Sequence, residues 1–354
     1  MKWLSLLLLF LMVGLNLLGE DVRVLIGQGD GVVFVANKGL VDVREVQEDI
    51  CFGDGQSLVY YQNRPYRGRI CVVKSGENVL VVNVLDIEDY VKGVLYNEIS
   101  HYWPIEAIKA QAVVSRTYAL YRALSSGGEG IFDLKDDQSS QVYRGYNSER
   151  FRTNKAVDET KGEILVCSDT NRVFPAFYHA CCGGETELPQ DVWSGTKFGC
   201  AFEVVKDPFC SISPYRSWKY EISFSNFIFS LHRLGVRGKE VKYISISEST
   251  HSGRTKSILL ITDKGQYVLS AQDVRISLGP SKLKSTLFKV QIQNNKVVFD
   301  GHGWGHGVGM CQWGAYGMAL KGYNYREILK FYYPNANISN ISSVLVSLGL
   351  VKKK

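Results

Sequence analysis

The chain has 354 residues, a formal net charge of +6 and an apolar content of 45%. This length accommodates one large domain or two smaller ones, and the composition is that of a globular protein. The mild positive charge allows attraction to an anionic polymer but does not indicate a nucleic-acid-binding protein. Its 20 tyrosines and 6 tryptophans are sufficient for a sugar-stacking surface, although β-rich cores also take up aromatic side chains.

The N-terminal segment has the pattern of an export signal. Lys2 precedes an almost wholly apolar run at residues 3–18, and Gly19, Glu20 and Asp21 follow it. A short positive region before an apolar run of this length predicts a signal peptide or an uncleaved N-terminal membrane anchor over residues 1–19. We therefore expect an exported protein in the periplasm, in the cell envelope or at the extracytoplasmic membrane surface.

The remaining elements predict an α+β fold. Residues 20–85 alternate β-branched and polar residues between glycines, which predicts a β-rich N-terminal segment. Residues 87–124 have helical spacing, and Pro104 opens a helix inside this span. Residues 218–298 alternate again and predict a β-rich subdomain or insertion. Residues 86–217 and 299–345 are expected to form one mixed domain, while Cys51 and Cys71, which flank a strand-rich segment, are a candidate disulfide pair in an exported chain.

Glu98 is the first candidate functional residue. It lies among apolar and aromatic residues, between Tyr96 and Ile99, directly ahead of the Pro104 helix. Such surroundings favour the protonated form of a carboxylic acid, which is the form that a proton donor needs. The alternative is an ordinary surface charge beside a helix. Gln111 and Arg116 are polar residues of the helix that follows, and they line the same cleft or brace it.

A glycine-rich run at residues 301–309, GHGWGHGVG, is the second candidate. Its alternate glycines disfavour a helix, so His302 and His306 differ from the two histidines of a zinc-binding His-Glu-x-x-His helix. Such glycine density lets the backbone approach a ligand or another segment closely. We expect four side chains at the rim of a cleft, with a tightly packed glycine turn as the alternative: Trp304, His306, Gln312 and Trp313.

A histidine and four cysteines are concentrated at residues 179–210: His179, Cys181, Cys182, Cys200 and Cys210. A histidine with two to four cysteines in one loop fits a tetrahedral structural zinc site. One or two disulfides are the alternative in an exported chain. Adjacent cysteines such as Cys181 and Cys182 do not usually bind the same ion.

Several blocks of the sequence resemble the stage II sporulation protein D family of peptidoglycan-acting proteins. They are YNEI at residues 96–99, WPIEAIKAQAVVSRTYAL from Trp103, SQVYRGY at 140–146, FYHACCGGETE at 177–187 and GHGWGHGVGMCQWGAYGMA at 301–319. The blocks occur in the order of the family and span most of residues 85–336. Residues 218–298 carry less of the resemblance. The chain departs from the family at Cys311, where the family has serine, and at Ile99, where methionine is frequent.

The resemblance implies a lytic transglycosylase that cleaves the MurNAc–GlcNAc bond of glycan strands denuded of stem peptides and leaves 1,6-anhydroMurNAc ends. The family's catalytic acid corresponds to Glu98. One carboxylate suffices, because the C6 hydroxyl of the sugar takes the place of water, whereas ordinary glycosidases need two carboxylates. The biological setting would be cell-wall remodelling, division or sporulation, with a cell-wall amidase as a partner.

The resemblance also implies a structural zinc ion and an alternative function. His179 and Cys182 match the family's metal region, and we take Cys200 and Cys210 as the remaining ligands, with Cys181 as a substitute. Some relatives are amidase enhancers, so the alternative is a non-catalytic glycan-binding enhancer of an N-acetylmuramoyl-L-alanine amidase. A weaker alternative is a metal-dependent hydrolase centred on His302 and His306.

Overall fold

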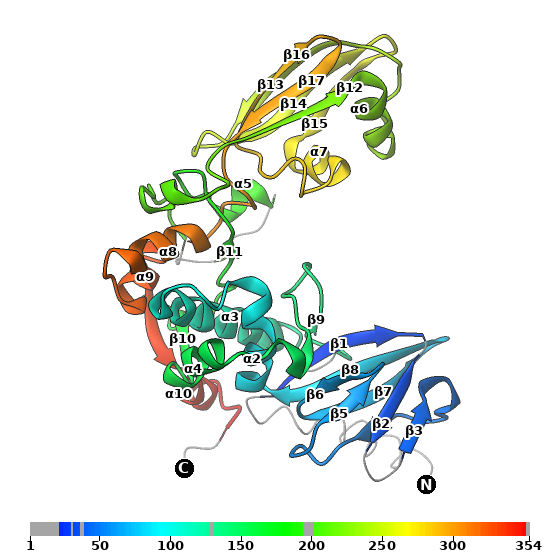
Figure 1. Ribbon diagram of the computed structural model, residues 1–354, viewed down its shortest axis with the longest axis vertical. Helices are drawn as coiled ribbons and strands as arrows, with labels where there is room; N and C mark the ends of the chain where they lie inside the picture. Colours follow the sequence, from blue (N-terminus) through cyan, green and yellow to red (C-terminus); the bar gives the residue numbers. More distant parts are fainter. Residues whose placement is uncertain are drawn as a thin grey trace. The chain divides into compact units, whose positions relative to one another are not determined.

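The computed structural model describes residues 21–29, 31–35, 39–127, 130–193, 198 and 202–351. The predicted export segment, residues 1–19, and Cys200 lie outside the described residues. The chain divides into two compact units, Met1–Ala176 with Asn337–Lys354, and Phe177–Ala336. The described elements include helices and several β-sheets, so the predicted α+β class is confirmed (Figure 1). The domain bounds predicted from the sequence stay a prediction.

The first unit begins with two β-sheets. The five-stranded sheet has the order β4 (Ile50–Phe52), β7 (Arg69–Ser75), β8 (Asn78–Asp86), β1 (Asp21–Gln28) and β9 (Leu134–Lys135). The four-stranded sheet has the order β3 (Gly39–Asp42), β2 (Val32–Val35), β5 (Val59–Tyr61) and β6 (Arg64–Tyr66), and a short 3-10 helix, Val43–Glu45, follows β3. Only β9 pairs in parallel within the five-stranded sheet, against β1. Most of these strands lie within residues 20–85, for which the sequence predicts a β-rich segment.

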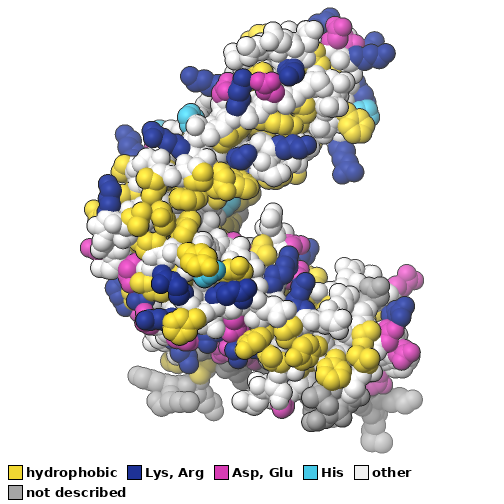
Figure 2. Space-filling model, in the orientation of Figure 1, with side chains coloured by type: hydrophobic (Ala, Val, Ile, Leu, Met, Phe, Trp, Pro, Cys, Tyr) yellow, Lys and Arg dark blue, Asp and Glu magenta, His cyan; other side chains and the backbone are white. Residues whose placement is uncertain are grey.

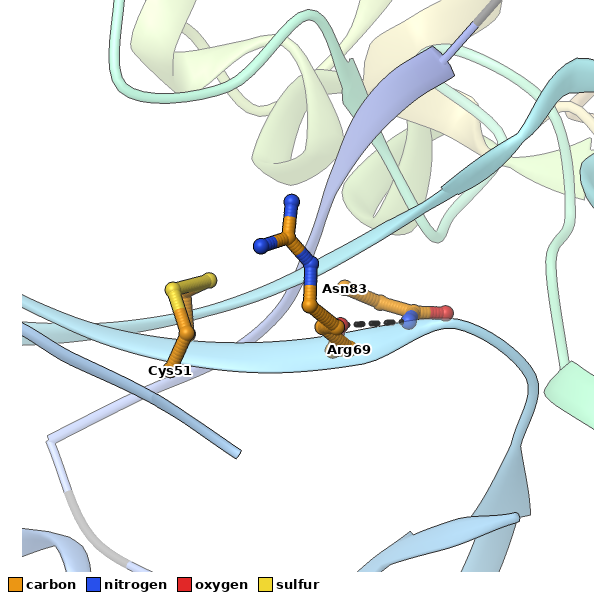
Figure 3. The surroundings of a disulfide bond; sticks show 4 residues. Cys51, Arg69 and Asn83 are labelled. Atoms are coloured by element: carbon orange, nitrogen blue, oxygen red, sulfur yellow. Dashed lines mark hydrogen bonds between the residues drawn. A yellow bond between two sulfur atoms is a disulfide. The ribbon is translucent and has the colours of Figure 1, made fainter. Parts of the chain in front are cut away.

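The candidate disulfide is present in this sheet. Cys51 of β4 lies directly opposite Cys71 of β7, and their sulfur atoms are bonded (Figure 3). The side-chain amide of Asn83, on β8, donates a hydrogen bond of 2.9 Å to the carbonyl of Arg69 (Figure 3). The disulfide therefore joins two neighbouring strands and closes a loop over a sequence separation of 20 residues.

Helices follow the sheets. They are α2 (Ile87–Glu98), α3 (Ile105–Ser125) and α4 (Phe151–Glu159), with a 3-10 helix at Gly145–Ser148. The expected helical span is broken after Glu98, because Ile99 has an extended backbone (φ −140°, ψ 145°) and α3 starts only after Pro104. Most of α3 is buried on all sides, as expected for a helix without a single apolar stripe. The unit is completed by β10 (Glu163–Cys167), which pairs with β19 (Ala336–Asn340), and by α10 (Ile341–Ser347).

The β-rich part of the second unit has two three-stranded sheets. One has the order β12 (Trp218–Ser223), β17 (Lys296–Gly301) and β16 (Phe288–Gln293). The other has the order β13 (Val241–Ser249), β14 (Thr255–Thr262) and β15 (Gln266–Ser270). Both contribute to one buried core with α6 (Phe224–Ser230) and α7 (Ala271–Leu278), which includes Phe227, Ile258 and Phe299. The turn between β16 and β17 uses Asn294 and Asn295 at positive φ (50° and 56°), as two-residue hairpin turns require.

The rest of the second unit holds the histidine–cysteine segment and the glycine-rich run. Its elements are β11 (Tyr178–His179), α5 (Pro189–Val192), a 3-10 helix (Phe209–Ile212), β18 (Met310–Cys311), α8 (Gln312–Leu320) and α9 (Tyr325–Tyr332). The strands β11 and β18 pair in parallel, which sets His179 beside Cys311. In the described part of the chain, no helix is both long and apolar enough to cross a membrane.

Candidate functional site

Glu98 is the last residue of α2 and is partly exposed. One carboxylate oxygen, Oε1, accepts a hydrogen bond of 2.8 Å from the backbone N–H of Val142. The buried Tyr90 lies within the electrostatic reach of Glu98, because burial first and the Glu98 charge second raise the pKa of Tyr90. The carboxyl group is therefore oriented by a backbone hydrogen bond and partly exposed to solvent.

The segment that holds Glu98 in place is the loop of residues 141–148. The side-chain amide of Asn97 donates to the carbonyls of Gly93 (3.0 Å) and Val142 (3.1 Å). Ser148 donates to the amide oxygen of Asn97 at 3.2 Å, and the hydroxyl of Tyr90 donates to Gln141 at 3.1 Å. These bonds explain why the Tyr-Asn-Glu and Ser-Gln-Val-Tyr blocks occur together: the second block supplies the N–H group that orients the acid of the first.

Aromatic and cationic side chains gather beside the end of α2. The ring of Tyr96 lies 5.2 Å from that of His101, and His101 lies 3.9 Å from Tyr102 between ring centroids. The guanidinium of Arg150 lies 4.3 Å from the centroid of the Tyr96 ring, and Arg152 donates to the carbonyl of His101 at 2.8 Å. Tyr102 is 82% exposed, so this cluster presents a wide aromatic face to solvent. Amphipathic rings of this kind suit a partly apolar, partly polar ligand.

Gln111 and Arg116 lie inside the fold instead. The amide of Gln111 donates to the hydroxyl of Ser115 at 3.1 Å, and both side chains are fully buried. The guanidinium of Arg116 makes two hydrogen bonds to the carboxylate of Glu88 (2.9 and 2.6 Å) and one to the carbonyl of Glu163 (3.0 Å). Of the two roles expected for these residues, the structure gives both of them the bracing position.

The glycine-rich run of the second unit is a tightly packed turn. Trp304 exchanges two backbone hydrogen bonds with Cys181, of 2.8 and 3.0 Å. Gly303 and Gly309 have positive φ values of 75° and 70°, and a Cβ at either would meet the backbone of Cys181 or of Phe177. Only glycine combines this conformation with so close an approach. The run therefore anchors itself against the histidine–cysteine segment.

The two histidines of this region take complementary roles in packing. Nδ1 of His179 donates to the carbonyl of Val308 at 3.1 Å, and Nδ1 of His306 accepts a hydrogen bond from the N–H of Val308 at 3.0 Å. Burial, followed by the nearby Arg254 charge, lowers the pKa of His179 to about 4. Burial, followed by His179, also lowers the pKa of His306. Nε2 of His179 is buried without a hydrogen-bond partner, which leaves one acceptor atom available to a ligand.

Four buried ligand-type side chains meet close to this turn. They come from three segments of the second unit, and one ligand atom of each lies within 4.8 Å of the others: Cys182, Asp207, Cys210 and Cys311. The sulfur atoms of Cys182 and Cys210 are 3.4 Å apart, and Cys182 lies 3.2 Å from a carboxylate oxygen of Asp207. We call this set the thiol cluster.

The cysteine sulfur atoms in and beside the thiol cluster have different surroundings, and their pKa values shift in opposite directions. The N–H groups of Cys182 and Gly314 both lie 3.3 Å from the sulfur of Cys311, which caps α8. Hydrogen bonds from Cys210 and Cys311 lower the pKa of Cys182 to about 6, whereas burial raises the pKa of Cys311. Cys181 lies within hydrogen-bonding distance of Cys210, and this contact raises the pKa of Cys181.

The predicted metal ligands are only partly brought together. Cys182 and Cys210 belong to the thiol cluster, His179 does not, and Cys200 lies outside the described residues. Asp207 and Cys311 were missed by sequence reasoning. Two signals were available: Asp207 stands three residues before Cys210, and Cys311 replaces the serine that is usual in the resembled family.

Of the residues predicted to line the rim of a cleft in the second unit, some are partly exposed and one is buried. Gln312 is buried in the first turn of α8, whereas Trp304 and Trp313 are partly exposed. Tyr215 lies between the two tryptophans, with ring centroids 4.5 Å from Trp304 and 6.5 Å from Trp313. Tyr316 continues the row, 5.3 Å from Trp313.

Comparison with known proteins agrees with this architecture. Residues 75–167, which contain Glu98, match a family model described as stage II sporulation protein, and residues 212–309 match a model described as a domain of unknown function. An uncharacterized protein of Brachyspira hyodysenteriae is 36% identical over 321 residues, which cover 88% of this chain and 83% of that protein.

Two relatives from Bacillus subtilis carry informative names. The amidase enhancer is 30% identical over 295 residues, covering 70% of this chain but 40% of the enhancer. Stage II sporulation protein D is 28% identical over 279 residues, covering 75% of this chain and 77% of that protein. Because residues 75–167 match the stage II sporulation protein model and the relatives align over most of the chain, this chain belongs to the stage II sporulation protein D family.

Proposed function

We propose that this chain is a peptidoglycan lytic transglycosylase and that Glu98 is its acid and base. The observation that carries the proposal is the setting of Glu98: a partly exposed carboxyl at the end of α2, oriented by the N–H of Val142 and flanked by an aromatic face. A partly exposed carboxyl group that is held in one orientation can exchange a proton with a bound sugar. Membership of the family supports the same assignment.

The proposed reaction needs one carboxyl group and no water. Protonated Glu98 gives its proton to the glycosidic oxygen as the bond from C1 of MurNAc to that oxygen breaks. The resulting carboxylate then takes the proton of the C6 hydroxyl of the same MurNAc, and O6 bonds to C1. The products are a GlcNAc-terminated strand and a 1,6-anhydroMurNAc end, and Glu98 returns to its protonated form.

The substrate in this proposal is a glycan strand denuded of stem peptides, met outside the cytoplasm after export. The name of one relative, amidase enhancer, connects the family with an amidase, the class of enzyme that removes stem peptides. Stage II sporulation protein D connects it with sporulation, although division and general remodelling use the same chemistry. We propose an amidase as the functional partner on this basis.

Substitution of Glu98 tests the reaction. We expect Glu98→Gln to lower the release of anhydro-saccharides from denuded glycan by at least about 100-fold, because a neutral amide cannot transfer the proton. The measurement is mass spectrometry of digests of intact and denuded peptidoglycan. Glu106→Gln is the matched control, since Glu106 lies in α3 and pairs with Lys109 at 3.1 Å. Full activity of Glu98→Gln would refute the assignment.

The second candidate function is a non-catalytic enhancer of an amidase, which the name of the Bacillus subtilis relative favours. It predicts no anhydro-saccharide release by the purified protein. In a coupled assay with a cell-wall amidase, the wild type and Glu98→Gln would then stimulate amide cleavage equally. Under the lytic transglycosylase proposal, the two proteins differ in the digest of denuded glycan.

We further propose that the thiol cluster holds a structural zinc ion. Two sulfur atoms bound to zinc at 2.3 Å in a tetrahedral arrangement lie about 3.8 Å apart, and the 3.4 Å between Cys182 and Cys210 is close to this spacing. The sulfur of Cys311 lies in the same cluster and accepts hydrogen bonds from two backbone N–H groups, which fix its position. Cys182, Cys210 and Cys311 would bind the ion, with Asp207 or Cys181 as the fourth ligand.

Such an ion would connect Cys311 of β18 to Cys182 and Cys210 and would take no part in the chemistry. Elemental analysis of the full chain should find one zinc per molecule, and cobalt substitution should give the absorption bands of a tetrahedral thiolate site. We expect Cys311→Ser to lose the ion and His179→Gln to keep it. Retention by Cys311→Ser, or loss from His179→Gln, would overturn the ligand set.

A further inference from the structure

Positive charge is concentrated in one part of the chain. Residues 212–309 contain 14 lysines and arginines but 6 aspartates and glutamates, a net charge of +8, whereas the whole chain has +6. Figure 2 shows several separate groups of Lys and Arg side chains on the visible face of the part formed by β12–β17, with some Asp and Glu side chains among them. Glu221 and Glu248 already pair with lysines of the same strands or of neighbouring ones. Arg254 and Arg275 are buried and bond within the fold, so only the exposed part of this excess can meet an anionic ligand.

Some of these cations lie beside the partly exposed aromatic row. Backbone hydrogen bonds join Gly303 to Tyr215 (2.9 Å) and Gly305 to Lys284 (3.0 Å), which brings three distant segments together. With the first turns of α8, these segments form what we call the aromatic–cationic patch: Tyr215, Arg216, Lys284, Trp304, Trp313 and Tyr316. All six residues belong to the unit Phe177–Ala336.

The charges of the patch have no carboxylate partner in the described part of the chain. Nζ of Lys284 lies 5.8 Å from the ring centroid of Trp304, and its hydrogen bond goes to the carbonyl of Ser281 at 3.2 Å. Arg216 is exposed, and its own carbonyl accepts from His302. An ammonium group has three N–H donors and a guanidinium group has five, so without a carboxylate partner both can donate to a negatively charged ligand.

We propose that the aromatic–cationic patch binds a glycan strand that carries free carboxylates. This inference rests on the proposed function, because it assigns a second binding surface for the same polymer, on a unit other than the one that contains Glu98. Aromatic rings stack against the apolar C–H faces of sugars. Lys284 and Arg216 pair with the carboxylate that an amidase leaves on each MurNAc when it removes the stem peptide, since each amide bond hydrolysed yields one carboxylate.

Direct binding measurements test the patch. The protein is the full chain carrying Glu98→Gln, so that the glycan stays intact, and the probes are denuded glycan and a neutral GlcNAc hexamer, both measured by calorimetry. We expect Lys284→Glu to weaken binding of denuded glycan about tenfold, equivalent to about 1.4 kcal/mol, and to leave the neutral hexamer unchanged. Trp304→Ala should weaken binding of both, because stacking does not depend on charge.

Lys264→Glu is the matched control, because it makes the same change of charge as Lys284→Glu. Lys264 is exposed and follows the C-terminal end of β14. The N-terminal end of β14, Thr255, bonds to Thr286, two residues from Lys284. Lys264 and the patch are therefore separated by roughly 24 Å, the length of an eight-residue strand. The control should bind like the parent protein. Unchanged affinity in both Lys284→Glu and Trp304→Ala would overturn the proposal, and so would equal affinity for polyglutamate, which would mean a general attraction to polyanions.

The outcome is independent of the catalytic assignment. If Glu98→Gln still cleaves glycan, the proposed acid is wrong, yet the effect of Lys284→Glu on the affinity for the uncut probe remains interpretable. If cleavage is lost as expected and the patch variants bind normally, the reaction stands and the patch is wrong.

Discussion

Arg116 is the largest side chain that the described part of the fold buries completely. Its position is tolerated because every face of the guanidinium has a partner, the carboxylate of Glu88 on one side and backbone carbonyls on the other. Glu88 is held in turn by the N–H of Gly162 at 2.8 Å. A buried ion pair in which each guanidinium nitrogen donates a hydrogen bond fixes α2 against α3, and α2 ends at Glu98.

Replacement of Arg116 should therefore affect stability before it affects substrate. We expect Arg116→Met to lower the free energy of unfolding by about 3–5 kcal/mol, because the carboxylate of Glu88 would remain buried without its partner. Urea denaturation followed by circular dichroism measures this. Lys155→Met is the control, since Lys155 makes an exposed pair with Glu159 and should cost below about 1 kcal/mol. Normal stability with a loss of glycan cleavage would instead assign Arg116 to the substrate.

At the scale of elements, the five-stranded sheet of the first unit contains a covalent restraint. The strands β4 and β7 are joined by Cys51–Cys71, and β4 has only three residues to hold it by backbone hydrogen bonds. A cross-link over this separation limits the unfolded chain more than the folded one.

Removing this restraint should destabilise the protein without changing its chemistry. For a loop of this length, we expect the double variant Cys51→Ala, Cys71→Ala to lose about 3 kcal/mol of unfolding free energy. The same denaturation experiment measures the loss, and the wild type treated with a reductant should approach the variant. Identical midpoints for oxidised wild type and variant would show that β4 is held in some other way.

The elements also show where local patterns succeed. Pro104 was expected to open a helix, and α3 begins at the next residue, because proline suits a helix start. The pattern did not reveal that the preceding helix ends at Glu98. That end depends on Asn97, whose amide bonds to Gly93 and Val142 across the 141–148 loop.

At the scale of the whole molecule, the proposed tasks separate between the two units. The unit of Met1–Ala176 and Asn337–Lys354 contains Glu98, and Phe177–Ala336 contains the thiol cluster and the aromatic–cationic patch. The charge separates as well, since residues 212–309 carry more than the whole net positive charge of the chain. Binding of a long polymer needs no single pocket, so a charged aromatic surface and a reactive carboxyl group can reside on different units.

The amino-acid sequence was sufficient for features that depend on neighbours along the chain. Strand alternation predicted the β-rich start, the Cys51–Cys71 pair followed from the strands that it flanks, and the blocks around Glu98 indicated the family. These features are local, because side-chain period, turn residues and motif spacing act over a few residues.

Only the tertiary structure decided which distant side chains meet. Cys311 lies 129 residues from Cys182, yet its sulfur accepts the N–H of Cys182, and no spacing rule connects the two positions. Burial likewise decided that Arg116 braces α2, although its type and helical position suited a substrate contact equally well. Long-range packing determines both outcomes, since it alone sets which polar groups leave water and which partners they find there.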